Sequence, residues 1–217
     1  MVVTVHVNSR VNRSAPELAR WRKVPTAIVA DVSNGACLID PDIRPLLPPG
    51  QQPRLFGFAV TAICEPPDFG AVLHALDLIE PDDVLLIDAK GHRDNAMLGE
   101  ILGGHLRRKR AAGVVCNGAV RDVAELAGWH DLSVFTRFIT PCGPTGVQLG
   151  AVNGPANIGG RVIEPGDLII GDDDGLVSLN AEMIRTLIDT AEAKLASEEK
   201  WQANLSAGKT IKETFSL

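Results

Sequence analysis

Tyrosine is absent from this chain of 217 residues, and the other aromatic residues are few, with six Phe and three Trp. A core with so few rings must be built mainly from Val, Ile, Leu and Ala. The chain also lacks an apolar run long enough to cross a membrane, and its first residues lack the apolar segment of a secretory signal. We therefore expect a cytoplasmic protein without a membrane partner.

Positive charge is also scarce, since the formal net charge is −6 and the one dense basic run is Arg107-Arg108-Lys109-Arg110. That run falls late in a predicted helix, where cations interact favourably with the carbonyl end. A solvated helix end explains it better than phosphate contacts, so no nucleic-acid partner is expected.

The four cysteines have neither C-x-x-C nor zinc-site spacing. The glycine-rich motifs that bind nucleotides and the G-x-S-x-G motif of hydrolases are missing.

The pattern of apolar residues and turn signals predicts alternating helices and strands. Helices are expected over residues 15–24, 26–36, 69–79, 96–112, 121–127 and 181–203, and strands over 56–64, 84–88, 114–116, 133–136, 147–152, 161–163, 167–171 and 175–179. Asn117-Gly118 and Asp174-Gly175 are read as turns. This order favours an α/β fold in which helices cover layers of sheet. We expect residues 1–217 to form a single domain, with N-terminal helices and a C-terminal helix as extensions.

The first candidate site is the segment Gly99-Glu100-Ile101-Leu102, near the start of the predicted helix at 96–112. Backbone N–H groups in a first helical turn lack partners and carry partial positive charge, so a carboxylate fits there. Gly99 leaves room for such a ligand. The alternative is a close helix contact through small residues with no ligand, and these residues alone do not decide between the two.

The second candidate is Arg121-Asp122, which follows a predicted strand. Arginine suits a planar carboxylate or an enolate oxygen, and Asp122 is a hard oxygen donor suited to Mg²⁺ or Mn²⁺. Glu125 lies one helical turn later and faces the same way. The alternative is an ion pair at a helix N-terminus. Lys90 could form a Schiff base, but a surface lysine is the commoner case, and His92 falls in a neighbouring loop.

With these motifs the chain resembles the RraA-like family, which includes 4-hydroxy-4-methyl-2-oxoglutarate aldolases and non-enzymatic regulators of ribonuclease E. The resemblance covers nearly the whole chain. The matching strings are Pro25-Thr26-Ala27, Gly99-Glu100, Asn117-Gly118-Ala119-Val120-Arg121-Asp122, Pro165-Gly166-Asp167-Leu168 and Asp172-Asp173-Asp174-Gly175. The aldolases have an acid, twenty other residues, Arg-Asp, and a further acid three residues on. Glu100, Arg121, Asp122 and Glu125 fit that pattern, although Glu100 replaces a shorter Asp and Asn117 replaces a common Asp.

The resemblance implies a swivelling β/β/α three-layer domain and a ring-shaped homotrimer with sites between subunits. It implies that Asp122 holds a divalent cation, Mg²⁺ or Mn²⁺. Gly99, Glu100, Ile101, Leu102 and Arg121 would bind the substrate. We expect Arg121, Asp122, Glu100 and Glu125 to be catalytic, with the two glutamates ordering metal-bound waters, one of which acts as base.

The activity expected from this resemblance is a metal-dependent carbon–carbon lyase. It would cleave a 4-hydroxy-2-oxo acid, of the 4-hydroxy-4-methyl-2-oxoglutarate type, to pyruvate, and would decarboxylate oxaloacetate as a side activity because both reactions pass through the same enolate. The first alternative is a protein regulator of ribonuclease E without chemistry. The second is a Schiff-base aldolase that uses Lys90.

Overall fold

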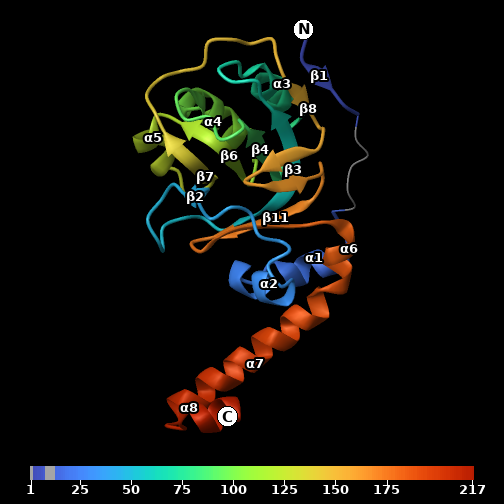
Figure 1. Ribbon diagram of the computed structural model, residues 1–217, viewed down its shortest axis with the longest axis vertical. Coiled ribbons are helices and arrows are strands. Elements are labelled where there is room, and N and C mark those ends of the chain that lie inside the picture. The colour runs from blue at the N-terminus through green and yellow to red at the C-terminus, as the bar shows by residue number, and fades with distance from the viewer. Residues whose placement is uncertain (1, 8–12) are drawn as a thin grey trace.

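The centre of the protein is a parallel sheet, seen in a computed structural model that describes residues 2–7 and 13–217 (Figure 1). Its four main strands are β3 (Leu55–Ile63), β4 (Asp83–Asp88), β6 (Gly113–Val120) and β7 (Ser133–Ile139), adjacent in that order. β4 and β6 are buried along their whole length. Such continuous burial is typical of parallel strands that are covered on both faces.

Shorter strands extend this sheet. The hairpin of β11 (Leu168–Asp172) and β12 (Gly175–Leu179) pairs antiparallel with the first half of β3. β8 (Ala151–Val152) pairs with the end of β3 and with β1 (Thr4–Val5), and β2 (Arg44–Pro45) pairs with β7. β5 (Ala96–Leu98) runs parallel to the last residues of β6. A separate hairpin consists of β9 (Ala156–Ile158) and β10 (Arg161–Ile163).

Alternating side chains of the parallel strands enter two different cores. Leu85 and Ile87 of β4 pack with helices α3 (Gly70–Leu78), α4 (Glu100–Arg108) and α5 (Val123–Ala127), whereas Leu86 packs toward β9, β10 and β11. A third core lies between the β11–β12 hairpin and the terminal helices. The chain therefore has the layered α/β fold that the sequence predicts.

The predicted helix at 96–112 starts too early, and the true start decides which residues lie at the helix N-terminus. Residues 96–98 form β5, whose Leu98 pairs with Val120, and the helix begins only at Glu100. The predicted turn at Asn117-Gly118 is also wrong, because β6 continues to Val120 with a register irregularity after Cys116. Pairing with strands on both sides overrides the local turn preference there.

Two other predicted strands have different bounds. β7 continues to Ile139, beyond the predicted end at 136, while the predicted strand at 147–152 contains only β8. Residues 140–150, which join these strands, are hereafter called the covering loop. The short strands β1, β2 and β9 were not predicted.

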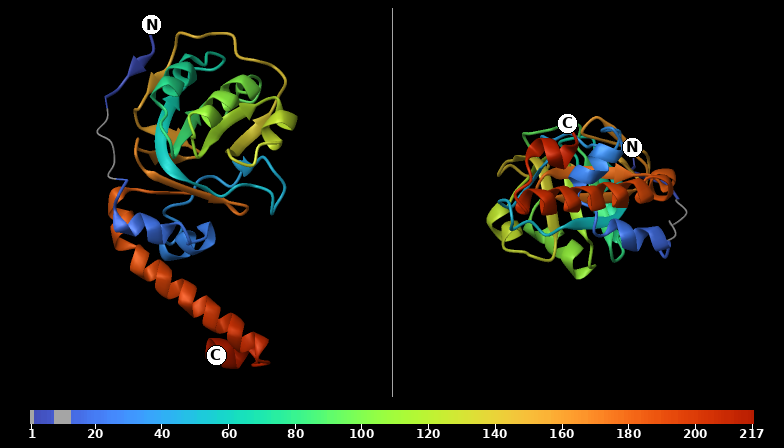
Figure 2. Two further views of the ribbon diagram at one scale, coloured as in Figure 1. Left: turned by 180° about the vertical axis from the view of Figure 1, so that it is seen from behind. Right: turned by 90° about the horizontal axis from the view of Figure 1, so that it is seen from below.

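The terminal helices form the lower layer of the molecule in Figure 1. They are α1 (Pro16–Trp21), α2 (Thr26–Val32), α6 (Ala181–Thr186), α7 (Ile188–Ser206) and α8 (Ile211–Phe215). The predicted helix at 181–203 is interrupted at Leu187. The outer part of α7 extends away from the sheet (Figures 1 and 2), and Trp201 packs there against Phe215, with ring centroids 4.8 Å apart. Among the described residues, no helix is long and apolar enough to cross a membrane.

The acidic run at 172–174 has a structural role. Asp172 accepts hydrogen bonds from the backbone N–H of Thr26 at 2.9 Å and from its hydroxyl at 2.5 Å. These bonds attach the start of α2 to the β11–β12 hairpin, whose two-residue turn is Asp173-Asp174. Asp172 therefore acts as a docking residue for the N-terminal helices.

Candidate functional site

The N-terminus of α4 supplies free backbone donors. Gly99 is the N-cap and has an extended backbone. The first N–H group that donates to a helix carbonyl is that of Gly103, which bonds to the Gly99 carbonyl at 2.9 Å. The Glu100 N–H donates to Oδ2 of Asp122 at 3.0 Å. Within residues 2–7 and 13–217, the N–H groups of Ile101 and Leu102 have no acceptor. They remain available to an anionic ligand.

Arg121 and Asp122 follow β6 directly and lie beside this helix end. The Arg121 N–H donates to the Leu98 carbonyl at 3.0 Å, which continues the pairing of β5 with β6. Asp122 then adopts a left-handed conformation, with φ of 56°, and its carbonyl accepts from Glu125 and Leu126 at 3.1 Å. Aspartate tolerates this conformation better than most residues. The reversal ends the strand and starts α5.

The side chain of Arg121 passes between two glycines. A Cβ atom on Gly99 would lie 2.9 Å from Cγ of Arg121, and a Cβ atom on Gly143 would lie 2.7 Å from its terminal nitrogen Nη1. The Nε atom is 3.5 Å from Oδ2 of Asp122, and the side chain is 41% exposed. Among the described residues, its terminal nitrogens donate to no acceptor. The guanidinium can therefore bind an incoming carboxylate.

These groups border a small cavity of about 170 Å³, hereafter the Arg121 cavity. Its lining residues are Phe69, Leu73, Ala96, Met97, Leu98, Gly99, Ile101, Leu102, Arg121, Asp122 and Pro144. Arg121 and Asp122 are the charged members, while the rest of the wall is apolar. A few polar groups on an apolar wall are typical of a small-molecule site.

The side chains of Glu100 and Glu125 border a different hollow. Both are exposed and border a wider hollow of about 660 Å³, hereafter the Glu125 hollow, together with Ile101, Gly104, Arg107, Arg108, Trp129 and Asp131. Ile101 borders both this hollow and the Arg121 cavity. Across the part of the chain that the structure describes, no three His, Cys, Asp or Glu side chains gather as a metal-binding cluster. The predicted site is thus divided, with Gly99, Ile101, Leu102, Arg121 and Asp122 on one side.

The covering loop contributes site residues that the sequence analysis missed. Gly143 touches Arg121, and Pro144 lines the Arg121 cavity. The string Pro141-Cys142-Gly143-Pro144-Thr145-Gly146 is an unusual density of turn residues between two strands, and that signal could have drawn attention to this loop.

Asp68 anchors the far end of the covering loop. Its carboxylate accepts hydrogen bonds from the N–H groups of Gly70 at 2.8 Å, Gln148 at 3.0 Å and Leu149 at 3.0 Å. Burial by itself would raise the pKa of Asp68, but the three backbone donors outweigh it and leave the pKa below its ordinary value. The ionised carboxylate therefore holds the loop against α3.

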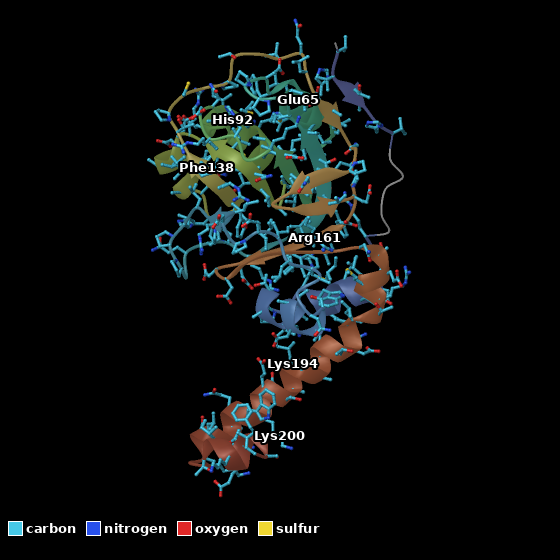
Figure 3. All side chains as sticks on the ribbon, viewed as in Figure 1. Glu65, His92, Phe138, Arg161, Lys194 and Lys200 are labelled. Atoms are coloured by element: carbon cyan, nitrogen blue, oxygen red, sulfur yellow. The ribbon has the colours of Figure 1, made fainter. Side chains whose placement is uncertain are left out.

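Lys90 and His92 belong to other surroundings. The Lys90 ammonium pairs with Glu65 at 2.5 Å and borders a hollow with Asp88, Asn117 and Arg137, separate from the Arg121 cavity. Nε2 of His92 lies 3.0 Å from Oδ1 of Asn95. Figure 3 labels Glu65 and His92 on this part of the molecule. The position of Lys90 gives no support to a Schiff base beside Arg121.

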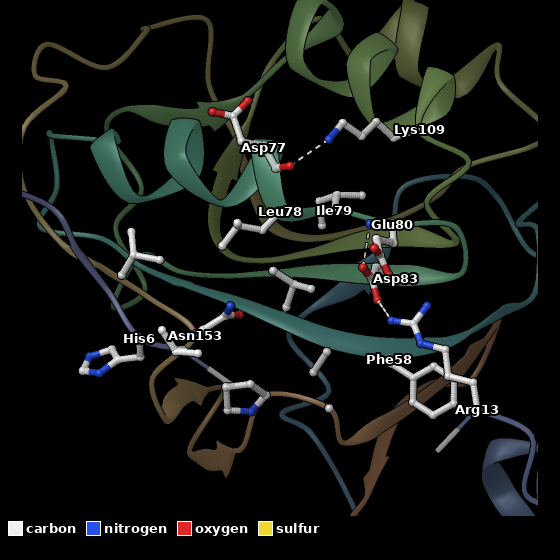
Figure 4. A pocket seen from close by; sticks show the side chains of 16 residues that line it. His6, Arg13, Phe58, Asp77, Leu78, Ile79, Glu80, Asp83, Lys109 and Asn153 are labelled. Atoms are coloured by element: carbon white, nitrogen blue, oxygen red, sulfur yellow. Dashed lines mark hydrogen bonds and ion pairs between the residues drawn. The ribbon is translucent and has the colours of Figure 1, made fainter. Parts of the chain in front are cut away.

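A further hollow of about 490 Å³ lies between β1 and the C-terminal end of α3 (Figure 4). Arg13 donates there to Asp83 at 2.5 Å, and Lys109 donates to the Asp77 carbonyl at 2.9 Å. None of the predicted site residues is among those that line it. This hollow is therefore distinct from the candidate site.

The fold and site define an α/β protein with a small cavity where a helix N-terminus meets an Arg-Asp pair. Comparison with known sequences agrees, because residues 26–178 match the RraA-like family, described as aldolase/RraA. The chain belongs to this family.

Individual relatives cover most of the chain. A Halalkalibacterium halodurans protein, provisionally named 4-hydroxy-4-methyl-2-oxoglutarate aldolase, is 30% identical over 87% of this chain and 88% of its own length. An uncharacterised Pseudomonas syringae protein superposes with a TM-score of 0.81 at 23% identity, over 95% of this chain and 99% of that one. The RNA-processing inhibitor RraA from Thermus thermophilus gives a TM-score of 0.64 at 27% identity, over 72% and 93%.

Proposed function

We propose that this protein is a divalent-metal-dependent lyase that cleaves a 4-hydroxy-2-oxo acid to pyruvate and decarboxylates oxaloacetate as a side activity. One observation carries the proposal: the guanidinium of Arg121 and the carboxylate of Asp122 border the same cavity as the free amides of α4. The Halalkalibacterium halodurans relative, named as an aldolase, supports the same reaction class.

The size and polarity of the Arg121 cavity favour a small oxo acid. Its volume of about 170 Å³ is below the roughly 300–1,000 Å³ of pockets that hold drug-sized ligands. A carboxylate placed there would meet Arg121 on one side and the N–H groups of Ile101 and Leu102 on the other. The cavity thus suits the pyruvate half of a substrate, and the rest of the substrate would extend toward solvent.

Arg121 would also assist the bond-breaking step. When the carbon–carbon bond of a 4-hydroxy-2-oxo acid breaks, negative charge moves onto the 2-oxo oxygen. A positioned guanidinium and backbone donors stabilise such charge more strongly in the transition state than in the ground state. The two glycines beside Arg121 leave it the space to approach the substrate closely.

Asp122 fits the role of a ligand for Mg²⁺ or Mn²⁺. Its Oδ2 accepts from the Glu100 N–H, while among the described residues Oδ1 accepts no hydrogen bond. A single carboxylate is compatible with Mg²⁺, which usually keeps several of its waters. When bound, the cation would supply Lewis-acid stabilisation of the developing negative charge.

Glu100 and Glu125 would act through water. Their place in the Glu125 hollow, next to the Arg121 cavity, suits carboxylates that orient solvent at its border. A water held in this way would take the proton of the 4-hydroxyl group as the bond breaks. This assignment makes the two glutamates acid–base residues and leaves substrate binding, metal binding and stabilisation of the enolate to Arg121 and Asp122.

We also propose a homotrimer. Ile211 of α8 and Leu217, which follows α8, are exposed away from the sheet, and Ile139 at the end of β7 is 59% exposed. Exposed apolar groups of this kind favour contacts between copies. Light scattering on the full chain should give three times the 23.1 kDa of one chain, and a monomer at micromolar concentration would contradict the assembly.

The experiment that tests the function is a pyruvate-release assay with 4-hydroxy-4-methyl-2-oxoglutarate and with oxaloacetate. Chelator should abolish release, and Mg²⁺ or Mn²⁺ should restore it. The similarity to an RNA-processing inhibitor favours a second candidate, a regulator of ribonuclease E. That candidate predicts no release of pyruvate under any condition, together with slower RNA cleavage when the protein is added to ribonuclease E.

A further inference from the structure

The loop before β5 is tied to the covering loop at the point where that loop touches Arg121. Nδ2 of Asn95 donates to the Gly143 carbonyl at 2.6 Å, and the same atom lies 3.3 Å from the sulfur of Cys142. One residue further on, the Ala96 N–H donates to the Cys142 carbonyl at 2.8 Å. Two successive residues therefore hold Cys142 and Gly143.

Gly143 in turn limits where the guanidinium of Arg121 can lie. The space where a Cβ atom of residue 143 would stand is only 2.7 Å from Nη1 of Arg121. The other side of the arginine is bounded by Gly99, where a Cβ atom would lie 3.2 Å from Nε. A shift of the 142–143 backbone would therefore change the space available to the guanidinium.

Asn95 is itself held in place. Its Oδ1 faces Nε2 of His92 at 3.0 Å, so the amide uses its oxygen on one side and its nitrogen on the other. The side chain of Asn95 is absent from the lining of the Arg121 cavity. Any influence of Asn95 on chemistry must therefore pass through the covering loop.

We propose that Asn95 is a positioning residue that sets the direction of the Arg121 guanidinium by fixing the Gly143 carbonyl. The inference rests on the proposed function, because that function makes Arg121 a group that binds the substrate. A displacement of a binding group by about 1 Å can lower the rate on the order of 10²-fold. Loss of the Asn95 donor should therefore reduce turnover although Asn95 never touches the substrate.

The test is a double-mutant cycle of Asn95→Asp with Arg121→Lys. Asn95→Asp keeps the size of the side chain and an oxygen for His92, but loses the donor to Gly143. When Asn95→Asp is made in the parent protein, we expect kcat/KM to fall by about 10–100-fold, mainly through kcat, as a positioning role predicts. In the Arg121→Lys background we expect a change below about 2-fold, because the two residues act as one unit. Equal losses in both backgrounds would overturn the proposal.

Asp94→Ala is the matched control, because its side chain is 78% exposed and pairs only loosely with Arg93, at 3.8 Å. We expect it to leave kcat/KM near the parent value. Melting temperatures of all variants establish that they are folded. Should Asn95→Asp fail to fold, Asn95→Ala replaces it in the cycle, since it removes the same donor to the Gly143 carbonyl.

A readout without turnover separates this inference from the proposed function. The Nε–H resonance of Arg121 is assigned by nuclear magnetic resonance through its loss in Arg121→Lys. We expect Asn95→Asp to shift or broaden it and Asp94→Ala to leave it unchanged. If the parent releases no pyruvate, the proposed function fails, but this resonance still decides the inference. An Arg121 signal that is the same in Asn95→Asp and parent would refute it.

Discussion

The carboxylate of Asp122 accepts a hydrogen bond from the backbone N–H of Glu100 at 3.0 Å. This bond joins the start of α5 to the start of α4, two helix ends that face the same cavity. The bond also gives an acceptor to one of the N–H groups at the start of α4 that have no partner within the helix. Because this acceptor is charged, the hydrogen bond is stronger than one between neutral groups. The same carboxylate is the proposed metal ligand, so its roles in structure and in binding can be separated by substitution.

Asp122→Asn should abolish metal-dependent pyruvate release while the protein stays folded. Asparagine tolerates the left-handed backbone at this position and its side-chain oxygen can still accept from Glu100, but it removes the charge that binds the cation. Calorimetric titration with Mn²⁺ and the melting temperature are the measurements. Asp122→Ala adds backbone strain of roughly 1 kcal/mol and serves as the contrast. Unchanged Mn²⁺ affinity in Asp122→Asn would remove Asp122 as the ligand.

Arg121→Lys and Arg121→Ala should both reduce kcat/KM by ~10²–10³, as expected when a donor to developing charge is lost. Lysine keeps the charge but loses the planar fork, so it should not restore the rate. The ion pair with Asp122 is long, at 3.5 Å, and about 40% exposed, so its loss should cost only ~0–1 kcal/mol of stability. Steady-state kinetics and thermal melts on both variants check this. Activity within a few-fold of the parent would make Arg121 structural.

Gly99→Ala should impair activity more than stability. The backbone at Gly99 is extended and suits any residue, but a Cβ atom would overlap Oδ2 of Asp122 and crowd Cγ of Arg121. Both side chains must shift, and we expect at least a ~10-fold loss of kcat/KM. Gly104→Ala, in the middle of α4, is the control: its Cβ meets nothing closer than 3.6 Å, and it should stabilise the helix by about 0.5–1 kcal/mol. Equal kinetics for the two variants would contradict the site.

Glu100→Gln and Glu125→Gln test the two carboxylates of the Glu125 hollow. If a water ordered by one of them takes the substrate proton, the corresponding variant should lose ~10²–10⁴ in kcat. KM and Mn²⁺ affinity should stay close to the parent values, because neither side chain lines the Arg121 cavity. The pH dependence of kcat identifies which glutamate is involved. If neither variant changes kcat, the proton acceptor lies outside this hollow.

Asp68 should make the stability of the protein depend on acid pH. Its pKa is lowered in the folded state, so its contribution is complete above the ordinary aspartate pKa of about 3.9 and is lost as pH falls toward the folded value. Asp68→Asn should cost ~1–3 kcal/mol near pH 7, because it removes the charge and one of the two oxygens that accept from three backbone N–H groups. It should also flatten the decline in melting temperature below pH 4. A decline as steep as in the parent would show that Asp68 is not its source.

The sequence by itself determined the order of most elements and the pairing of Arg121 with Asp122. Strands such as β3 and β4 were predictable because these short apolar runs are rich in residues that favour strands. Arg121 and Asp122 are adjacent in the chain, and Gly99 lies close before a helix, so local chemistry made an anion site one of two interpretations there, and the family resemblance favoured it.

Only the tertiary structure decided how these segments meet. β5 forms because β6 offers it a parallel edge, although the local sequence favours a helix from residue 96. The contact of Gly143 with Arg121, the bond from Asn95 and the separation of Glu100 and Glu125 from the Arg121 cavity depend on loops distant in sequence. Helical and strand periods describe one segment at a time, whereas these contacts are set by the packing of several segments against one sheet.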